Sequence, residues 1–569
     1  MTLVRARPVP VAATVAVALV ISSCTSEQEG SGAPGATSSS QGSTTGPSAP
    51  TAQESAVLTQ QGVNAGHPLA ADAGMQMLNQ GGNAVDAAIA ASFAVSVVEP
   101  YASGIGGGGS ALVADADGTT GAFDYREVVA QDGRIPASNT GIPGFVAGMA
   151  QLHQQRGSLD WAELVRPAVE MADNGVPVTG TLVQRIAAGG GAATSGLEQF
   201  WPGGAALQVG DQLVQTDLAD SLRTLQREGA EGFYAGSLAD AVSAVDGLDR
   251  GSLEAYTVQQ SVPPQGQVGD YQVVSSSPAL PGAALIRLLQ DLDAGGISEV
   301  DPDSAEHVRR VSQAWVDAEQ TVQTQLGDPD FVDVDVEGIL RPVSEEEGPQ
   351  AAEGPDSADS ADSATVALGD GDVADSQNML TPGNTTHLTV VDGDGTVVSM
   401  TNTLTEFWGS GTEVGGFFLN DQLSRFSTVN SANNQPEPGR RSVTWSNPTM
   451  VLDDQGRPVL GIGTPGGANI LSILANALSR WVLQGQSLAE AVVAPRFRLD
   501  AGSGTLLVEP GMMDTPVGSQ LSGLGWPVQT SAEGLFGSVQ ALQVNYDDGT
   551  VTGPTDTRLE AGTLISDVR

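Results

Sequence analysis

The stretch "GNTTHLTVVDGDGTVVSMTNTL", residues 383–404, decides how the whole sequence is interpreted. Apolar and β-branched residues flank an Asp-Gly-Asp-Gly turn signal at 392–395, which predicts a β-hairpin. Threonine is β-branched and suits strands, so the threonines are simple strand residues in one interpretation. However, an acidic low-complexity tract runs up to Gly383-Asn384, where a chain is readily cut. In the second interpretation one threonine becomes a new N-terminus; the candidates are Thr385, Thr386, Thr401 and Thr403.

The composition bounds the functions that the chain can have. Its 569 residues, 40% of them hydrophobic, suffice for a large single domain or two ordinary ones. The formal net charge is −44, and all 23 basic residues are arginines. Such acidity argues against nucleic acid as a partner, because phosphate backbones attract basic surfaces. It favours solubility and fits a salty habitat, although a composition bias of the source lineage explains it as simply.

The N-terminal segment has the plan of a bacterial lipoprotein signal peptide. Two arginines precede an apolar run at 9–22 that is too short to span a membrane, and "ISSCTS" then contains the single cysteine, Cys24. This plan predicts a signal peptide over residues 1–23, a lipid on Cys24 and a flexible polar tether over 24–54. We therefore expect an extracytoplasmic protein that meets the cell membrane only through its lipid anchor. An ordinary signal peptide with an incidental cysteine is the alternative.

The remaining sequence alternates helical and strand patterns. Globular sequence starts near residue 55, and residues 66–100 predict two helices broken at Gly81-Gly82, the second rich in alanine and fit for tight burial. Residues 343–380 are acidic and nearly free of aromatic residues, which predicts disorder. The other expected elements are a hairpin turning at 115–118, mostly helices over 140–260, a helix over 307–326, strands over 387–404, 414–420, 448–453 and 458–463, and a helix near 469–482.

Several common catalytic and cofactor motifs are missing. The glycine run "GIGGGGS" at 104–110 precedes a strand and lacks the lysine of a phosphate loop, so we interpret it as a turn that lets backbones pass closely. The four histidines form no metal-spaced pair, the aspartate-rich pieces lack a complete calcium loop, and no Ser–His–Asp grouping stands out. We therefore expect neither metal nor cofactor. A threonine whose own α-amino group acts as the base remains as the candidate nucleophile.

A second glycine motif, "GTPGGAN" at 463–469, ends one predicted strand and opens a helix. The backbone N–H groups of Gly466 and Gly467 can face a developing oxyanion at such a turn. A purely structural turn explains these glycines equally well.

Several motifs, in this order and spacing, resemble those of γ-glutamyltranspeptidases. The resemblance covers about residues 55–569, which is all of the globular sequence. The matching stretches are "GGNAVDAAIAASFAVSVVEPYASGIGGGG" (81–109), "FDYRE" (123–127), "TTHLTVVDGDGTVVSMTNTL" (385–404), "GTPGGANI" (463–470) and "VVAPRFRLD" (492–500).

The resemblance implies an α+β fold, the four-layer αββα sandwich of N-terminal-nucleophile hydrolases. It also implies a precursor that cuts itself between Asn384 and Thr385. The products would be a large chain, whose globular part is 55–384, and a small catalytic chain, 385–569, held together as a heterodimer.

Matching the family motifs residue by residue gives each site residue an expected role. Thr385 is then the nucleophile and Thr403 the threonine that orients it, while Thr386 and Thr401 are structural. The remaining matches are Gly466 and Gly467 in the oxyanion hole, Arg126 on the substrate α-carboxylate, and Asn420 and Gln422 in the donor pocket.

Four positions depart from the family pattern. Arg425 stands where the family has the aspartate that holds the substrate ammonium. Thr444 and Trp445 replace the paired serines that hold the carboxylate, and Thr405 replaces an asparagine that helps to hold the amine. Because an arginine repels an ammonium and attracts a carboxylate, we expect an intact catalytic apparatus behind a rewritten donor pocket. Asp421 and Glu406 are the nearby carboxylates that could restore an amine contact.

The leading interpretation is an enzyme that hydrolyses or transfers γ-glutamyl amides, such as glutathione-type donors, through a Thr385 acyl-enzyme. A polyglutamate-cutting or dicarboxylic-acyl amidase, acting on glutaryl or cephalosporin-type substrates, is the alternative with the same chemistry. There Arg425 would bind an extra carboxylate, and the short 427–440 segment would admit a long chain, unless that shortness is a tolerated loop deletion. A binding lipoprotein without catalysis is the third interpretation, which the retained Thr385, Thr403 and glycine pair disfavour.

Overall fold

The computed structural model describes residues 58–340, 385–532 and 534–569. The predicted signal peptide, Cys24, the tether, the acidic segment and Asn384 lie outside these residues. The chain from Ser55 to Arg569 groups as one compact unit.

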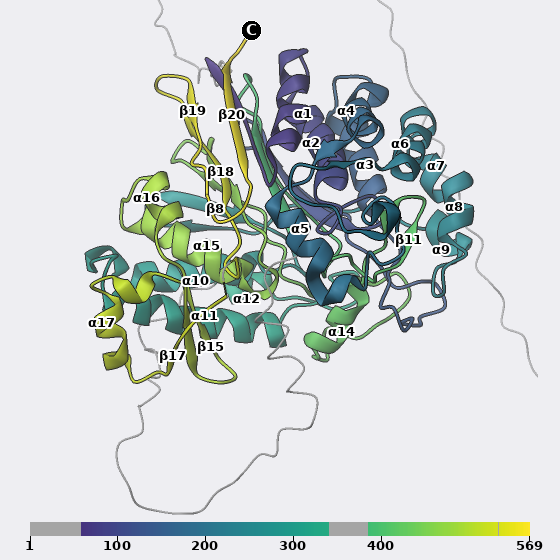
Figure 1. The fold of residues 1–569 in the computed structure, drawn as a ribbon. Coiled ribbons are helices and arrows are strands. Elements are labelled where there is room, and N and C mark those ends of the chain that lie inside the picture. Colours follow the sequence, from purple (N-terminus) through teal and green to yellow (C-terminus); the bar gives the residue numbers. More distant parts are fainter. Residues whose placement is uncertain (1–57, 341–384, 533) are drawn as a thin grey trace, which may run out of the picture. The chain divides into compact units, whose positions relative to one another are not determined.

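The predicted hairpin forms the centre of the first sheet. Its strands are β9 (Thr385–Val391) and β10 (Val397–Thr403), and the Asp392 carboxylate fixes the turn by accepting the backbone N–H groups of Asp394 and Thr396. The edge of the sheet beside β9 is built from strands far away in the sequence, since β1 near the N-terminal end lies between β9 and the C-terminal strand β20 (Figure 1). The antiparallel order is β20 (Gly562–Asp567), β1 (Gln60–Ala65), β9, β10, β2 (Gly108–Ala114), β3 (Thr120–Asp124), β6 (Gln259–Ser261).

A second antiparallel sheet packs face to face on the first. Buried apolar side chains such as Leu112 and Val397 from the first sheet meet Met450 and Leu542 from the second. The sheets approach closely where Gly463 lies against the His387 ring, because a Cβ at Gly463 would stand only 2.2 Å from that ring. The order of the second sheet is β19 (Thr550–Thr552), β18 (Gln540–Asn545), β14 (Pro458–Gly463), β13 (Thr449–Leu452), β8 (Tyr271–Ser275), β7 (Gln265–Val268).

Helices cover the outer face of each sheet and complete the four layers (Figure 1). The alanine-rich α2 (Ala84–Val98), buried along its whole length and begun by an Asn83 capping box, packs against β9 and β10. On the other side α10 (Gly282–Ala294) packs against β7 and β8, with α11 (Ala305–Thr324) and α15 (Ile470–Leu478) beside it. The predicted αββα sandwich is confirmed.

The first sheet carries most of the remaining helices, and several elements there are short. The expected break at Gly81-Gly82 is confirmed, as are the hairpin of β2 and β3 and the helical character of residues 140–260. The helices on this side are α1 (Pro68–Asn79), α3 (Phe145–Arg156), α4 (Trp161–Asn174), α5 (Gly180–Ala187), α6 (Thr216–Glu228), α7 (Ala230–Tyr234), α8 (Ser237–Val242) and α9 (Arg250–Glu254).

Two sequence-based predictions need correction. Residues 414–420 do not form one strand: two short strands, β11 (Glu413–Val414) and β12 (Phe417–Phe418), fold back on each other, because Gly415 and Gly416 both take positive φ angles, 56° and 85°. The helix expected near 469–482 keeps α-helical form only to Leu478 and continues to Leu483 as a π-helical turn.

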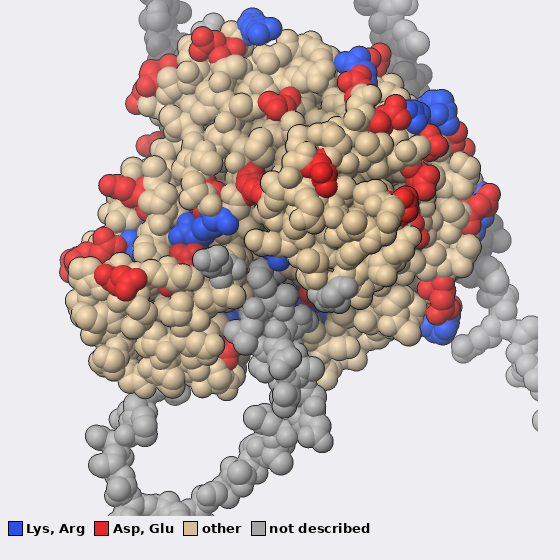
Figure 2. Space-filling view, in the orientation of Figure 1, with Lys and Arg blue, Asp and Glu red and all other residues tan. Residues whose placement is uncertain are grey.

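The surface agrees with the acidic composition. Figure 2 shows acidic side chains scattered over the visible face, with fewer basic ones dispersed among them. Among the described residues, no helix combines the length and apolar character needed to cross a membrane.

Candidate active site

Thr385 lies where the predicted nucleophile should be, next to Thr403. Thr385 begins β9 and Thr403 ends β10, and the two are paired residues in the antiparallel register. Their hydroxyl oxygens are 3.2 Å apart, and the two residues are only 8% and 3% exposed. The backbone N–H of Thr405 donates to the Thr403 oxygen at 2.8 Å. One lone pair of Thr403 is therefore occupied, which orients its hydroxyl beside Thr385.

Thr405, whose N–H donates to Thr403, has a strained backbone conformation. Its φ angle is 83°, in the left-handed region that a β-branched residue rarely adopts. Such a conformation costs about 1–3 kcal/mol and persists only where surrounding contacts enforce it. Here the Thr405 N–H is held by Thr403, and the Thr405 hydroxyl donates to the side-chain oxygen of Gln422.

The glycine turn after β14 borders Thr385, the predicted nucleophile. Gly466 and Gly467 have φ angles of 156° and 54°, and Pro465 just before them lines the same small pocket as Thr385. Within the part of the chain that the structure describes, no protein acceptor takes the N–H of Gly466 or Gly467. Two free N–H groups beside a hydroxyl nucleophile have the chemistry of an oxyanion hole.

Arg425 is neutralised by a partner that the sequence did not reveal. Its guanidinium pairs with the Glu406 carboxylate at 2.8 Å, and its side chain is 10% exposed. The Glu406 N–H donates to the Asp421 carboxylate at 2.9 Å. Burial and the neighbouring Glu406 raise the pKa of Asp421 to about 7, while Arg425 opposes the rise. The predicted donor pocket therefore holds a compensated charge cluster, less positive than Arg425 alone would make it.

The other predicted donor-pocket residues are buried and engaged with the protein. The Asn420 amide donates to the carbonyls of Gly106 and Gly141 and accepts two backbone N–H groups, so it has no group left for a substrate in this geometry. Gln422 connects the Thr405 hydroxyl to Ser442. Thr444 is 6% exposed. Asn420 and Gln422 hold the loop that carries Arg425, and their direct substrate contacts stay predictions.

Arg126 is committed to an internal ion pair. Its guanidinium donates to both Asp124 carboxylate oxygens, at 2.6 Å for the shortest contact, and to the Ser442 carbonyl at 2.6 Å. It is 0% exposed, and Asp124 also faces Arg441 at 3.5 Å. A substrate carboxylate would have to compete with Asp124, so the predicted contact at Arg126 stays a prediction.

Comparison with known proteins agrees with this geometry. The sequence profile of the gamma-glutamyltranspeptidase family matches residues 70–565. The chain belongs to this family. The capsule biosynthesis protein CapD proenzyme of Bacillus anthracis is 34% identical over 499 residues, which are 87% of this chain and 89% of that one. The glutathione hydrolase proenzyme of Bacillus subtilis (strain 168) is 30% identical over 524 residues, covering 86% and 89%.

A solved structure shows the same fold. The crystal structure of a cephalosporin acylase from Bacillus halodurans superposes with a TM-score of 0.77 over 91% of this chain and 98% of its own, at 24% identity. The sequence profile thus confirms the predicted family, and the shared fold agrees with the predicted αββα sandwich.

The structure of this γ-glutamyltranspeptidase family member also places Glu99 beside Thr385. The sequence motifs assign no role to this glutamate. Its carboxylate accepts the hydroxyls of Thr386, at 2.8 Å, and Tyr101, at 3.3 Å. Burial raises the pKa of Glu99 to about 7, against the effect of these hydrogen bonds. Thr386, expected to be structural only, therefore also borders the pocket of Thr385. Thr401 binds His387, whose pKa burial lowers to about 3.

Glu127 is a second buried acid that the sequence motif does not explain. It is 0% exposed, and neither carboxylate oxygen has a hydrogen-bond partner among the described residues. Burial raises the pKa of Glu127 to about 8, although Arg126 favours its charged form. The side chain is therefore mostly neutral at physiological pH.

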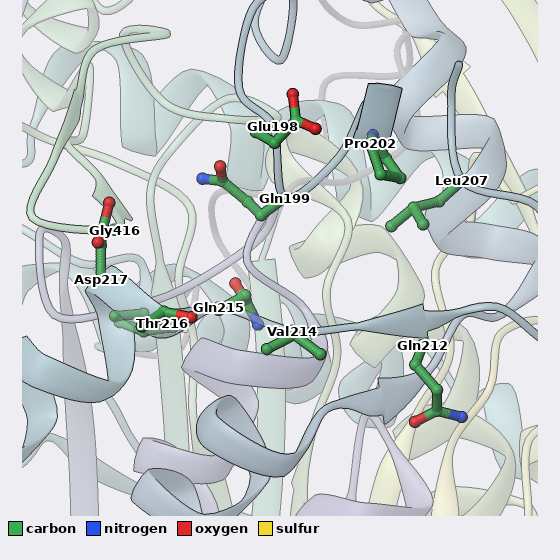
Figure 3. Close-up of a pocket in the computed structure, with 11 residues that line it drawn as sticks. Glu198, Gln199, Pro202, Leu207, Gln212, Val214, Gln215, Thr216, Asp217 and Gly416 are labelled. Carbon is green, nitrogen blue, oxygen red and sulfur yellow. The ribbon is translucent and has the colours of Figure 1, made fainter. Parts of the chain in front are cut away.

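The other pocket considered has few charged side chains and none of the predicted site residues. Figure 3 shows a pocket between residues 198–218 and Gly416, which contains none of the predicted site residues. Its only charged lining side chains are Glu198 and Asp217, which lie apart in the view. No grouping of three or more His, Cys, Asp or Glu side chains suited to a metal occurs in residues 58–340 and 385–569 where the structure describes them.

Proposed function

We propose that the protein is a self-processing acyltransferase and amide hydrolase that acts on γ-glutamyl amides through Thr385. The observation that carries this proposal is the buried Thr385–Thr403 hydroxyl pair at the start of β9, with Thr403 oriented by the Thr405 N–H. Cleavage between Asn384 and Thr385 would free the amino group that a threonine nucleophile needs as its base. The names of both curated relatives, each a proenzyme, support such processing.

The proposed reaction uses few groups. The freed α-amino group takes the proton of the Thr385 hydroxyl while its oxygen attacks the γ-carbonyl carbon. The N–H groups of Gly466 and Gly467 stabilise the negative charge on the carbonyl oxygen. The leaving amine takes the proton and departs, which leaves an ester on Thr385. Water or another amine then attacks this ester and restores the hydroxyl.

The two fragments would remain together after cleavage. In the first sheet β1 from the larger fragment lies between β9 and β20 from the smaller one. In the second sheet β8 of the larger fragment pairs with β13 of the smaller one. The strands of both fragments share hydrogen bonds and cores in both sheets, which supports the proposed heterodimer.

A second candidate substrate class is a dicarboxylic acyl group or a polyglutamate chain. It is favoured by the Arg425–Glu406 pair, which stands where the family has an aspartate for the substrate ammonium. A second substrate carboxylate, or an acylated amine, would meet Arg425 with less repulsion than a free ammonium. The cephalosporin acylase with the same fold supports cephalosporin-type amides as the alternative substrate class.

One assay separates these candidates. Purified, processed protein is given a γ-glutamyl anilide and a glutaryl anilide, which differ only in the α-amino group. Turnover of either that disappears in Thr385→Ala supports the proposed chemistry, and the ratio of the two kcat/KM values identifies the donor class. Turnover of neither, with intact self-cleavage, would contradict γ-glutamyl-type acyl transfer.

We also propose that Cys24 carries the membrane anchor. The two arginines and the short apolar run before it, together with the small residues that lead up to this cysteine, support this location. Cys24→Ser should move the protein from the membrane fraction to the soluble fraction, because the proposed attachment is a lipid on that sulfur. Tight membrane association of Cys24→Ser would contradict lipidation at this residue.

A further inference from the structure

The pocket in Figure 3 is built from parts of the chain that the proposed reaction does not use. Its volume is about 430 Å³, within the range of about 300–1,000 Å³ that is usual for ligand sites. Residues 198–207 line one side, and the other side is formed by residues from β5 (Gln212–Leu213) to the start of α6. Gly416, from the turn between β11 and β12, completes the lining. The pocket can therefore hold a small organic molecule or a side chain of another protein.

Gln215 presents a hydrogen-bond acceptor that the protein leaves unused. The residue is 3% exposed, and its amide nitrogen donates to the Val97 carbonyl at 2.8 Å. This contact fixes the orientation of the amide, and its oxygen, Oε1, has no partner among the described residues. Figure 3 shows this oxygen on the side of the amide that faces Gln199. Because a buried acceptor without a partner costs free energy, a hydrogen-bond donor bound in the pocket would be stabilised.

The charged side chains around the pocket are all acidic. Glu198 and Asp217 line it, and neither forms an ion pair within the part of the chain that the structure describes. The arginines of α6, Arg223 and Arg227, pair with other acids. Burial raises the pKa of Glu413, and the nearby charge of Asp217 adds to the rise, so a third carboxyl group lies close by. These acids outweigh the partial positive charge at the start of α6, and the pocket therefore favours a cation.

An apolar surface lies next to these acceptors. Pro202, Leu207 and Val214 line the pocket, and Val214 is 41% exposed. A hydrocarbon chain that covers this surface removes apolar area from water. A metal ion would gain nothing from such a surface, and no grouping of three or more metal-binding side chains occurs among the described residues. The lining therefore matches a ligand that joins a hydrocarbon chain to a hydrogen-bond-donating cation.

We propose that this pocket binds a primary alkylammonium group, with its hydrocarbon chain on Leu207 and Val214 and its ammonium donating to Gln215 Oε1 and Asp217. An ammonium carries three donors and no acceptor, so it can satisfy both residues at once. The group can belong to a free aliphatic amine or to a lysine side chain of another protein. This chain contains no lysine, so a second copy of it cannot supply such a side chain. The site does not depend on the chemistry at Thr385.

The test compares ligands that differ in one group. Isothermal titration of the purified protein uses 1-aminopentane, Nα-acetyl-lysine methylamide and Nα-acetyl-norleucine methylamide, which lacks the ammonium of the lysine compound. Wild type should bind at least one of the two amines, and the norleucine compound at least tenfold more weakly. Asp217→Asn should raise the Kd of the amine by about tenfold or more, as expected when a charged hydrogen bond is lost. Glu198→Gln, which removes the other lining charge, should raise it by a smaller factor.

The two amines distinguish the sources of the ammonium group. Tighter binding of the lysine compound identifies a protein side chain as the occupant, and tighter binding of 1-aminopentane identifies a free amine. Either result supports an alkylammonium site, because both ligands carry the same charged group on a hydrocarbon chain.

Asp220→Asn is the matched control, because Asp220 lies one turn further along α6, pairs with Arg223 and does not line the pocket. It should bind the amines as wild type does. Asp217→Asn should also keep the wild-type turnover of the anilide substrates, which separates this site from the proposed reaction. Equal binding of the norleucine compound, or an unchanged Kd in both Asp217→Asn and Glu198→Gln, would overturn the inference. Displacement of the amine by an equimolar amount of Mg²⁺ would also overturn it, because the acids would then hold any cation.

Discussion

Thr385 and Thr403 face each other across two neighbouring antiparallel strands, with their hydroxyl oxygens 3.2 Å apart. The strand register places them together, and the Thr405 N–H holds the Thr403 oxygen from the other side. Backbone pairing thus fixes the proposed nucleophile next to the residue proposed to orient it, so substitutions at the two residues should have different effects.

The first prediction concerns Thr403 as a positioning residue. Thr403→Val keeps the shape but removes the hydroxyl, so we expect slower self-cleavage and a kcat lowered by about ten- to a hundredfold, with little change in KM. Thr403→Ser keeps the hydroxyl and should retain most of the activity. Wild-type kcat in Thr403→Val, or equal losses in both variants, would mean that the hydroxyl does not orient Thr385.

The second prediction concerns the strained Thr405. Asparagine tolerates the left-handed region better than a β-branched residue, so Thr405→Asn should raise the free energy of unfolding by about 1 kcal/mol. Thr405→Val keeps the strain and loses the hydrogen bond to Gln422, so it should lower stability. Urea unfolding of both variants at one protein concentration checks this order. If Thr405→Asn is the less stable of the two, relief of backbone strain is not the dominant effect.

The third prediction concerns the buried acid Glu127. Burial raises its pKa from 4.5 to about 8, so the folded protein binds this proton more tightly than the unfolded chain. The resulting stability is fully present below about pH 4.5 and is lost as the pH rises through about 8, at about 1.4 kcal/mol for each pKa unit of difference. Glu127→Gln, which cannot ionise, should therefore lose less stability than wild type between about pH 5 and pH 9.

Urea midpoints across this pH range provide the measurement for Glu127. The charged groups near this carboxyl, Arg126, Asp124 and Asp421, are present in both proteins, so the difference isolates Glu127. The exposed Glu299→Gln is the control and should follow wild type. Parallel pH profiles of wild type and Glu127→Gln would show that Glu127 does not hold its proton in the folded state.

The fourth prediction concerns donor specificity. Arg425→Asp replaces a cation with an anion beside Glu406 and Asp421, so a substrate ammonium should bind better. We expect kcat/KM for a γ-glutamyl anilide to rise by about tenfold or more, since about 1.4 kcal/mol corresponds to tenfold. Glu406→Gln leaves Arg425 without this partner and should lower the same value. A wild type that already prefers the free-amine donor, with Arg425→Asp impaired, would show that Arg425 does not face the donor.

The sequence predicted those parts of the site that depend on local pattern. The hairpin of β9 and β10 follows from alternation around "DGDG", and the glycine turn follows from its position between a strand and a helix. Residue types alone did not reveal contacts made across long separations. Glu406 lies nineteen residues before its partner Arg425, and β20 pairs with β1 from the opposite end of the chain.

The pocket that contains Thr385 shows the same limit most clearly. It is assembled from α5, the start of β9, the segment after β10 and the loop before β20. No spacing rule connects these segments, because only the packing of the two sheets and the helix brings them together. Likewise, the pKa values of Glu99 and Glu127 depend on burial, which the motif "DYRE" or a lone glutamate does not encode.

The central claim is that Thr385 becomes an N-terminal nucleophile, and N-terminal sequencing of the purified protein tests it most directly. The account predicts two chains, of which the smaller comprises residues 385–569 and begins Thr-Thr-His-Leu, while Thr385→Ala stays uncut. A wild-type protein that remains a single chain, or a small chain that begins at any other residue, would contradict it.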